Sequence, residues 1–99
     1  MGLGYALSEE LVFDPAKNIY LNPDFLDYKL PTIMDIPNIH LELIEPNEPT
    51  GPLGAKGVAE HAINCVPGAT ANAIYNAVGV RVKDLPIKPE KILRLLGKI

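Results

Sequence analysis

The hydrophobic and polar positions of residues 38–46, NIHLELIEP, alternate more cleanly than those of any other stretch. Ile39, Leu41 and Leu43 would share one face of an extended chain, and His40, Glu42 and Ile44 the other. This period of two predicts a half-buried β-strand over residues 39–45, in which His40 faces solvent or an edge. VRVKDLPI, residues 80–87, alternates briefly and is a candidate for a second strand.

Helical spacing predicts three helices. GYALSEELVF, residues 4–13, indicates one short helix. Residues 62–78 indicate a longer one, which ends at Gly79 as a C-terminal cap. KPEKILRLLGK indicates a last helix near 89–96, with Pro89 near its first position and Gly97 after its end. The middle helix carries a stripe suited to close packing, formed by Ala62, Val66, Ala69, Ala73 and Ala77.

Pro67 and Gly68 conflict with an unbroken helix over residues 62–78. Either the helix kinks there, or a first turn ends and a second helix begins with Pro67 in its opening turn. The second interpretation is slightly favoured.

Residues 14–38 are interrupted by prolines at positions 15, 23, 31 and 37. Proline removes a backbone donor and restricts the residue before it, so no long element fits here. We therefore expect a single small α+β domain over residues 1–99, with two or three helices, one or two strands and a proline-rich extended arm.

Composition restricts the kinds of partner and compartment. The chain is 47% hydrophobic, has a formal net charge of −3 and shows no basic cluster, which argues against nucleic acid and anionic membranes. No apolar run approaches the length of a membrane span, and no signal peptide is visible. A single cysteine, Cys65, gives no internal disulfide and no zinc spacing, so we expect a cytoplasmic protein and no metal-ligating residues.

The stretch GPLGAKGVAEH, residues 51–61, holds the candidate chemistry. Glycines allow close backbone approach to a ligand, and a following helix N-terminus suits phosphate. However, Gly51, Gly54 and Gly57 match neither a P-loop nor a dinucleotide fingerprint. A plain structural turn and a ligand loop both remain open.

Glu60 follows this glycine loop at the start of the apolar helix, where we expect buried neighbours. A carboxylate placed between burial and a helix N-terminus can serve as a general base; the alternative is a first-turn acid that complements the helix dipole. His61 is expected near solvent, and adjacent helical residues diverge too much for Glu60 and His61 to share a metal. Cys65 is expected to be a buried small hydrophobe.

Four stretches together resemble one family. GYALSEELVFD, LNPDFLDYKLPTIMDIP, EPTGPLGAKGVAE and ANAIYNAVGVRVKDLPIKPEKIL are similar, in order, to the C-terminal end of the molybdenum-binding large subunit of xanthine dehydrogenases and aldehyde oxidases. The family motif Gly-Ala-Lys-Gly-Val-Gly-Glu corresponds to residues 54–60. The resemblance implies that Glu60 is the general base beside molybdenum, and that Gly57, Val58 and Ala59 line the molybdopterin cofactor. Ala59 stands where the family commonly has glycine, and His61 where it has proline.

The resemblance also implies partners. Large subunits of the family run to several hundred residues, so we expect this chain to be a fragment or a separately encoded piece. It would be inactive alone and would not hold molybdenum–molybdopterin alone. Its expected partners are the remainder of the molybdenum-binding subunit, together with FAD and iron–sulfur subunits or domains; in isolation we expect a homo-oligomer, as a dimer. The alternatives are a structural or interaction module without activity and, less favoured, a free-standing anion-binding domain that uses residues 54–57.

Overall fold

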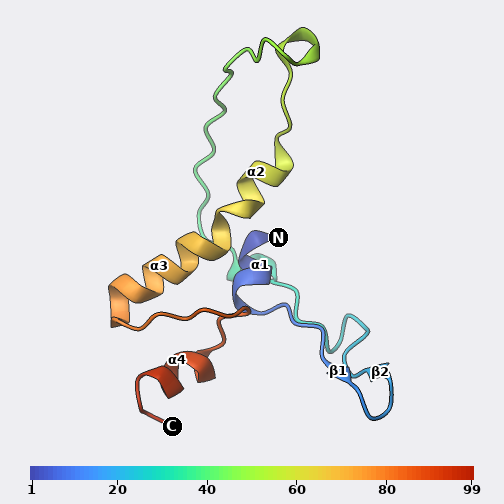
Figure 1. Ribbon diagram of the computed structural model, residues 1–99, viewed down its shortest axis with the longest axis vertical. Helices are drawn as coiled ribbons and strands as arrows, with labels where there is room; N and C mark the ends of the chain where they lie inside the picture. The colour runs from blue at the N-terminus through green and yellow to red at the C-terminus, as the bar shows by residue number, and fades with distance from the viewer.

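Four short helices and one two-stranded antiparallel sheet make up the regular structure of residues 1–99 in the computed structural model (Figure 1). This composition confirms the α+β class. The elements, in chain order, are α1 (Gly2–Leu7), β1 (Phe13–Asp14), β2 (Ile19–Tyr20), α2 (Ala59–Asn64), α3 (Val66–Val78) and α4 (Pro89–Leu95), with 3₁₀ turns at Ile33–Asp35 and Pro52–Gly54.

The buried residues of the chain gather at one place, where α1 meets α3 and the segment before α4. Six residues are buried: Gly2, Gly4, Ala6, Val82, Pro86 and Ile87. The Ile87 N–H donates to the Ala6 carbonyl at 2.6 Å. A Cβ added to Gly2 would lie 2.7 Å from the Cβ of Val66, so glycine lets α1 contact the first turn of α3. We call α1, the first turn of α3 and residues 82–87 the base.

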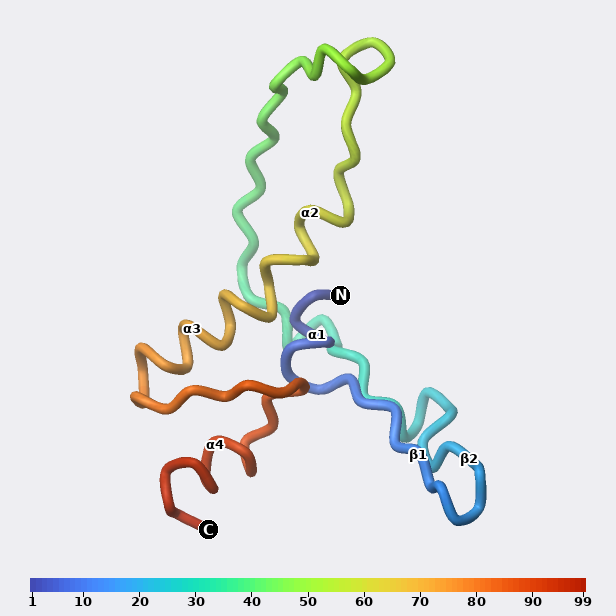
Figure 2. Tube along the Cα trace, in the orientation of Figure 1, coloured from blue at the N-terminus to red at the C-terminus, as the bar shows by residue number.

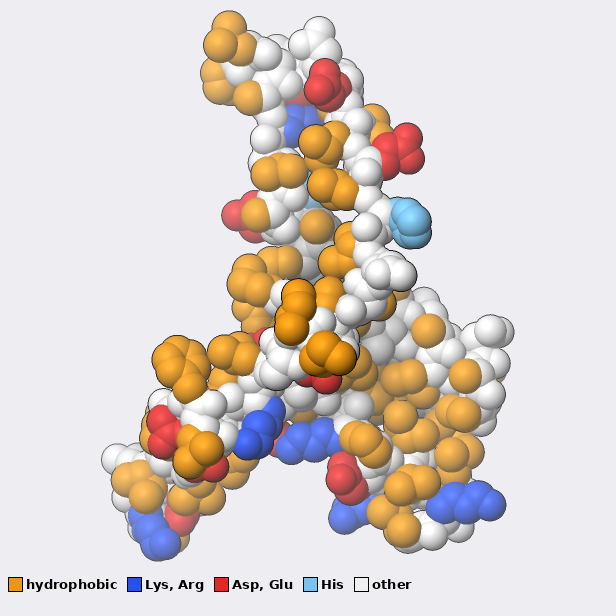
Figure 3. Space-filling view, turned by 180° about the vertical axis from the view of Figure 1, so that it is seen from behind, with side chains coloured by type: hydrophobic (Ala, Val, Ile, Leu, Met, Phe, Trp, Pro, Cys, Tyr) orange, Lys and Arg blue, Asp and Glu red, His pale blue; other side chains and the backbone are white.

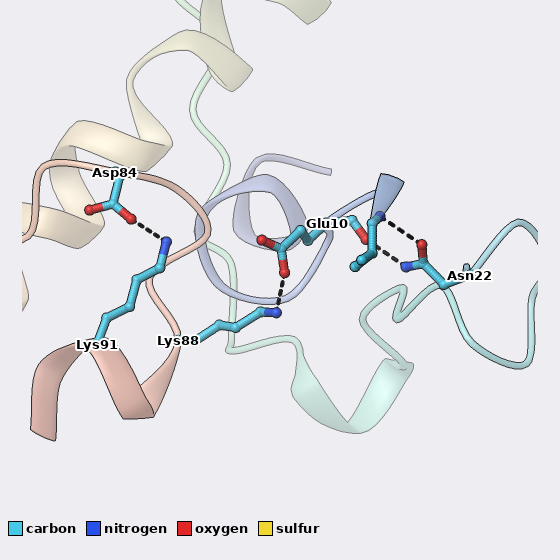
Figure 4. Close-up of polar contacts among 6 residues, drawn as sticks. Glu10, Asn22, Asp84, Lys88 and Lys91 are labelled. Atoms are coloured by element: carbon cyan, nitrogen blue, oxygen red, sulfur yellow. Dashed lines mark hydrogen bonds and ion pairs between the residues drawn. The ribbon is translucent and has the colours of Figure 1, made fainter. Parts of the chain in front are cut away.

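Side-chain contacts tie the neighbouring segments to the base (Figure 4). Lys88 donates to the Glu10 carboxylate, and this hydrogen bond lowers the pKa of Glu10. Lys91 pairs with Asp84. Asn22 accepts from the Val12 N–H at 2.8 Å and donates to the Glu10 carbonyl at 2.6 Å, which holds the chain after α1 extended.

The ends of α3 and α4 lie where the prolines and glycines of the sequence predicted them. Cys65 separates α2 from α3, and Pro67 lies in the opening turn of α3, as the favoured interpretation requires. Gly79 ends α3 in the left-handed conformation at φ 75°. Pro89 is the first residue of α4, and Gly97 follows its end with φ 65°.

The first helix is shorter and earlier than the expected range 4–13. It ends at Leu7, where the N–H groups of Ser8 and Glu9 both bond to the Gly4 carbonyl. Beyond this point the Asn22 side chain hydrogen-bonds to the Val12 N–H and the Glu10 carbonyl, which a continuing helix would pair within itself. Phe13 pairs with Tyr20 in the small sheet.

The predicted strands at 39–45 and 80–87 are wrong for this structure. Neither segment pairs with another strand, because no extended neighbour of the same chain lies alongside it. Residues 80–87 instead pass against α1 with a bend at residues 84–86. The sheet formed by the chain lies within the proline-rich segment, at β1 and β2.

Of the small-residue stripe in α3, only its first member, Val66, packs against another element. Ala69, Ala73 and Ala77 are exposed, whereas Val66 and Ile74 are half-buried. The contact of Gly2 with Val66 sets which side of α3 faces α1, and that contact depends on a residue far away in sequence.

Residues 36–58 leave the base and return to it as a long excursion, which we call the projecting loop (Figure 2). Its outgoing limb is residues 36–47 and its return limb residues 55–58. The radius of gyration is 17.6 Å, against about 13 Å for a compact chain of this length. None of the helices is long and apolar enough to cross a membrane.

Candidate functional site

The glycine stretch forms the tip and the return limb of the projecting loop, and its glycines have different roles. Gly54 has a φ of 75°, a backbone conformation that favours glycine. A Cβ on Gly51 would collide with the Ala55 carbonyl oxygen, and one on Gly54 with the Asn47 side chain. Gly51 and Gly54 therefore serve the tight turn, which supports the structural interpretation for these two positions.

Two residues that the sequence analysis did not single out also build the tip. Glu48 accepts from the hydroxyl of Thr50 at 2.7 Å and from its N–H at 3.2 Å, and these bonds lower the pKa of Glu48. Asn47 takes a φ of 49° and lies against Gly54. The signal that was available is the run of turn-forming residues from Pro46 to Gly51.

Gly57 differs from the other two glycines, because it lies beside the candidate base. A Cβ placed on Gly57 would be 3.7 Å from Oε2 of Glu60 and 3.0 Å from Cε1 of His61. Both side chains, in the first turn of α2, thus have atoms close to Gly57. The absence of a side chain at Gly57 leaves room for them.

Both limbs of the projecting loop line a hollow of about 510 Å³. Its walls are residues 43–47 of the outgoing limb and residues 53–58 of the tip and return limb. The N–H groups of Lys56, Gly57 and Val58 donate no hydrogen bond within the chain. Free backbone donors next to a hollow suit an oxygen-rich ligand.

Burial around Glu60 does not match the expectation from sequence. Glu60 and its neighbours Val58 to Ala62 are exposed, and α2 has no buried residue. The sequence placed Glu60 correctly at the start of a helix, but of the residues of α2 only Ile63 is half-buried and the rest are exposed.

The other candidates lie apart from this group. His40 is an exposed residue of the outgoing limb, and Cys65 is an exposed free thiol whose Sγ lies 3.5 Å from the Ala62 carbonyl oxygen. The expectation of a buried Cys65 is therefore wrong, for the same reason as at Glu60. No three His, Cys, Asp or Glu side chains converge as metal ligands.

The residues of the return limb meet the chemical demands of a molybdopterin cofactor. Such a group carries phosphate and pterin oxygen and nitrogen atoms, which bind to peptide N–H groups. The free donors at residues 56–58 provide them. Ala59 begins α2 and carries only a methyl group as its side chain.

Comparison with known proteins was made on the whole sequence. The molybdopterin cofactor-binding domain family matches residues 1–37. The chain is 39% identical over 92 residues to the xanthine dehydrogenase molybdenum-binding subunit of Escherichia coli O157:H7, covering 93% of this chain and 12% of that protein. It is 42% identical over 100 residues to the aldehyde oxidoreductase molybdenum-binding subunit PaoC of Escherichia coli K12, covering 100% of this chain and 14% of that protein.

A further similarity, 36% identity over 94 residues, is to the 6-hydroxypseudooxynicotine dehydrogenase complex subunit gamma of Paenarthrobacter nicotinovorans, with 92% of this chain and 12% of that subunit covered. The chain thus spans only about an eighth of the length of these relatives. The match to the family ends at residue 37, at the start of the projecting loop, whereas the similarity to the individual relatives extends over nearly the whole chain.

Proposed function

Because the chain is homologous to a short segment of the molybdenum-binding subunits of the xanthine dehydrogenase and aldehyde oxidoreductase family, we propose that it supplies a catalytic base and a cofactor-lining loop to such an enzyme. Glu60 is the base, and residues 57–59 line the cofactor. The observation that carries the proposal is the position of the Glu60 carboxylate beside Gly57, at the end of a limb with free N–H groups.

Residues 57–60 each have a distinct role in this proposal. The N–H groups of Gly57 and Val58 hold polar atoms of the cofactor, and the small Ala59 keeps the approach to them open. When bound, the cofactor supplies the redox centre for hydroxylation of a heterocycle or an aldehyde. Glu60 accepts a proton at its carboxylate, and Gly57 leaves the space in which the proton donor reaches Oε2.

The exposed setting of Glu60 explains why we expect no turnover from the chain alone. General-base catalysis needs the reacting groups held together and water excluded, and here the hollow is open and α2 is uncovered. We therefore propose that the chain works only with the remainder of a molybdenum-binding subunit, and with FAD and iron–sulfur partners.

A second candidate function is an interaction module that assembles with a partner and takes no part in chemistry. It is favoured by one observation: only six of 99 residues are buried, so almost the whole chain is available for contact. The two functions differ in what they require of Glu60.

The test is Glu60→Gln in a fusion that replaces the aligned segment of PaoC by this chain. The amide keeps the shape of the side chain but cannot accept the proton, so turnover with an aldehyde should fall by about 10²–10⁴. Molybdenum content should stay unchanged, because the proposed cofactor contacts are backbone N–H groups.

Glu90→Gln is the matched control, since Glu90 is also an acid in the first turn of a helix. It should leave turnover unchanged. If Glu60→Gln retains full turnover with full molybdenum content, Glu60 is only a first-turn acid and the interaction module is the better account.

A further inference from the structure

The outgoing limb of the projecting loop is an extended segment with a defined beginning and end. Residues 38–45 lie between Pro37 and Pro46, neither of which can donate a backbone hydrogen bond. Prolines at both ends and alternating side chains between them are typical of one β-strand of eight residues, about 27 Å long.

No backbone group of this limb is paired within the chain. Residues 36–47 neither donate nor accept a hydrogen bond to another residue, and the return limb does not pair with them. The return limb cannot provide a matching strand, because it is short and leads directly into α2. The partner strand must therefore come from outside this chain.

The apolar face of the limb is also uncovered. Ile39, Leu41 and Leu43 are 72%, 81% and 68% exposed, although they form the most regular apolar row in the sequence. Figure 3 shows apolar side chains along the projecting loop, away from the base. A row of this kind is stable in water only when another surface covers it.

We infer that residues 38–45 are the edge strand of a β-sheet whose other strands lie elsewhere in the molybdenum-binding subunit. This inference rests on the proposed function and adds to it the surface through which the chain docks. Ile39, Leu41 and Leu43 face the interior of the subunit, and the face formed by His40, Glu42 and Ile44 lies toward solvent, because an antiparallel sheet commonly has one face buried and one solvated.

A larger sheet fits this strand better than a second copy of the chain does. Two copies would form only a two-stranded ribbon, which is marginal in water, whereas an existing sheet supplies further strands and an apolar floor. Docking of the outgoing limb would also fix one wall of the hollow beside Gly57, because both limbs line it. The strand thus positions the site without touching the reacting atoms.

Amide hydrogen exchange tests the inference in the PaoC fusion, with the isolated chain as reference. An edge strand directs alternate N–H groups at its neighbour. We expect every second amide among residues 38–45 to exchange at least 100-fold more slowly in the fusion than in the isolated chain, and the amides between them to change little.

Two variants that introduce the same residue at neighbouring positions test which face of the strand docks. Leu41→Thr removes a side chain from the interior face and should speed exchange of the protected amides at least tenfold. Glu42→Thr changes the solvent face and should alter the rates less than twofold. Equal effects of the two variants would contradict the proposed orientation.

Fast exchange of all amides at 38–45 in the fusion would overturn the inference. So would slow exchange in the isolated chain together with dimer formation, which would assign the strand to a second copy. If the fusion does not accumulate, the chain is co-expressed with PaoC that lacks the aligned segment. The inference would also be overturned if neither the fusion nor the co-expressed pair gave a complex. The proposed function fails separately, on the turnover of Glu60→Gln.

Discussion

Asp35 has the best-defined hydrogen bonds of any acid in the chain. The N–H and the hydroxyl of Thr32 both donate to its Oδ2, at 2.7 and 2.8 Å, and close a capping box around the 3₁₀ turn Ile33–Asp35. These bonds favour the charged form, the backbone bond most, so the pKa of Asp35 lies below its ordinary value.

The pH dependence of this turn follows from the lowered pKa. The stabilisation is fully present above the unfolded-state pKa of Asp35 and is lost as the pH falls through the lower folded-state pKa, since a protonated carboxyl accepts the two bonds poorly. Thr32→Val removes the hydroxyl donor and keeps the N–H. NMR titration of the side-chain carboxyl should show the pKa of Asp35 rising part of the way to its ordinary value.

Thr50→Val gives the matched control for that titration. It should raise the pKa of Glu48, where the hydroxyl bond is the leading cause of the lowering, and leave Asp35 unchanged. An Asp35 pKa that does not respond to Thr32→Val would mean that its hydroxyl bond is not formed in solution.

Single residues also show how much of the candidate site could be predicted from the sequence. The position of Glu60 at a helix start was predictable from the glycine loop and the apolar run that follows, because both signals are local. Its exposure was not predictable, nor was that of Cys65, because burial depends on which distant segments cover a helix, and here none covers these two residues.

At the scale of elements, local signals predicted α3 and α4 correctly, whereas the strand expected at 39–45 depends on a distant neighbour and is not formed. Proline and glycine fix helix ends by local geometry, so Pro67, Gly79 and Pro89 gave correct bounds. A strand needs a neighbour, and alternation in one segment does not say whether the same chain supplies it. The shortened α1 is a related case, since Asn22 competes for its backbone.

The contact of α1 with α3 can be tested through Gly2. Gly2→Ala would place its Cβ 2.7 Å from that of Val66 and should push the two helices apart. Exchange of the Ile87 amide, which donates to Ala6, should become at least tenfold faster, corresponding to about 1.4 kcal/mol of local stability.

Two further variants make that measurement specific. Val66→Ala added to Gly2→Ala should restore part of the slow exchange, because it removes the Val66 Cγ2 methyl, 2.7 Å from the new Cβ, and leaves only the contact with the Cβ of residue 66. Gly68→Ala has open space around it and should leave the Ile87 amide as it is. If all three variants behave alike, helix propensity and not the collision decides the rate.

At the scale of the whole molecule, the chain exposes far more surface than a compact protein. Its accessible surface is 8223 Å², about 2,700 Å² more than the roughly 5,500 Å² expected for a folded monomer of this mass. The excess exceeds what a standard protein interface buries in total. This agrees with a chain that is completed by a larger partner.

In the absence of that partner, we predict that the isolated chain self-associates. It should sediment as a dimer at high concentration and bind a dye specific for apolar surface. The exposed row Ala69, Ala73 and Ala77 of α3 is the expected contact. Ala73→Glu should weaken association, and added salt should not, since the contact is apolar. A monomer at all concentrations without dye binding would contradict this prediction.

The projecting loop leaves the base at residue 36 and rejoins it through α2, and this has a consequence for how the length of the loop can vary. For a closed loop, each doubling of length costs only about 0.6 kcal/mol of chain entropy. Residues 38–45 and 57–60 are placed by their distance from the base, not from the tip. Insertions or deletions around Asn47–Gly54 would therefore change the reach of the loop while leaving both the strand and Glu60 in place. The tip is therefore the part of the projecting loop whose length can change most without moving either limb.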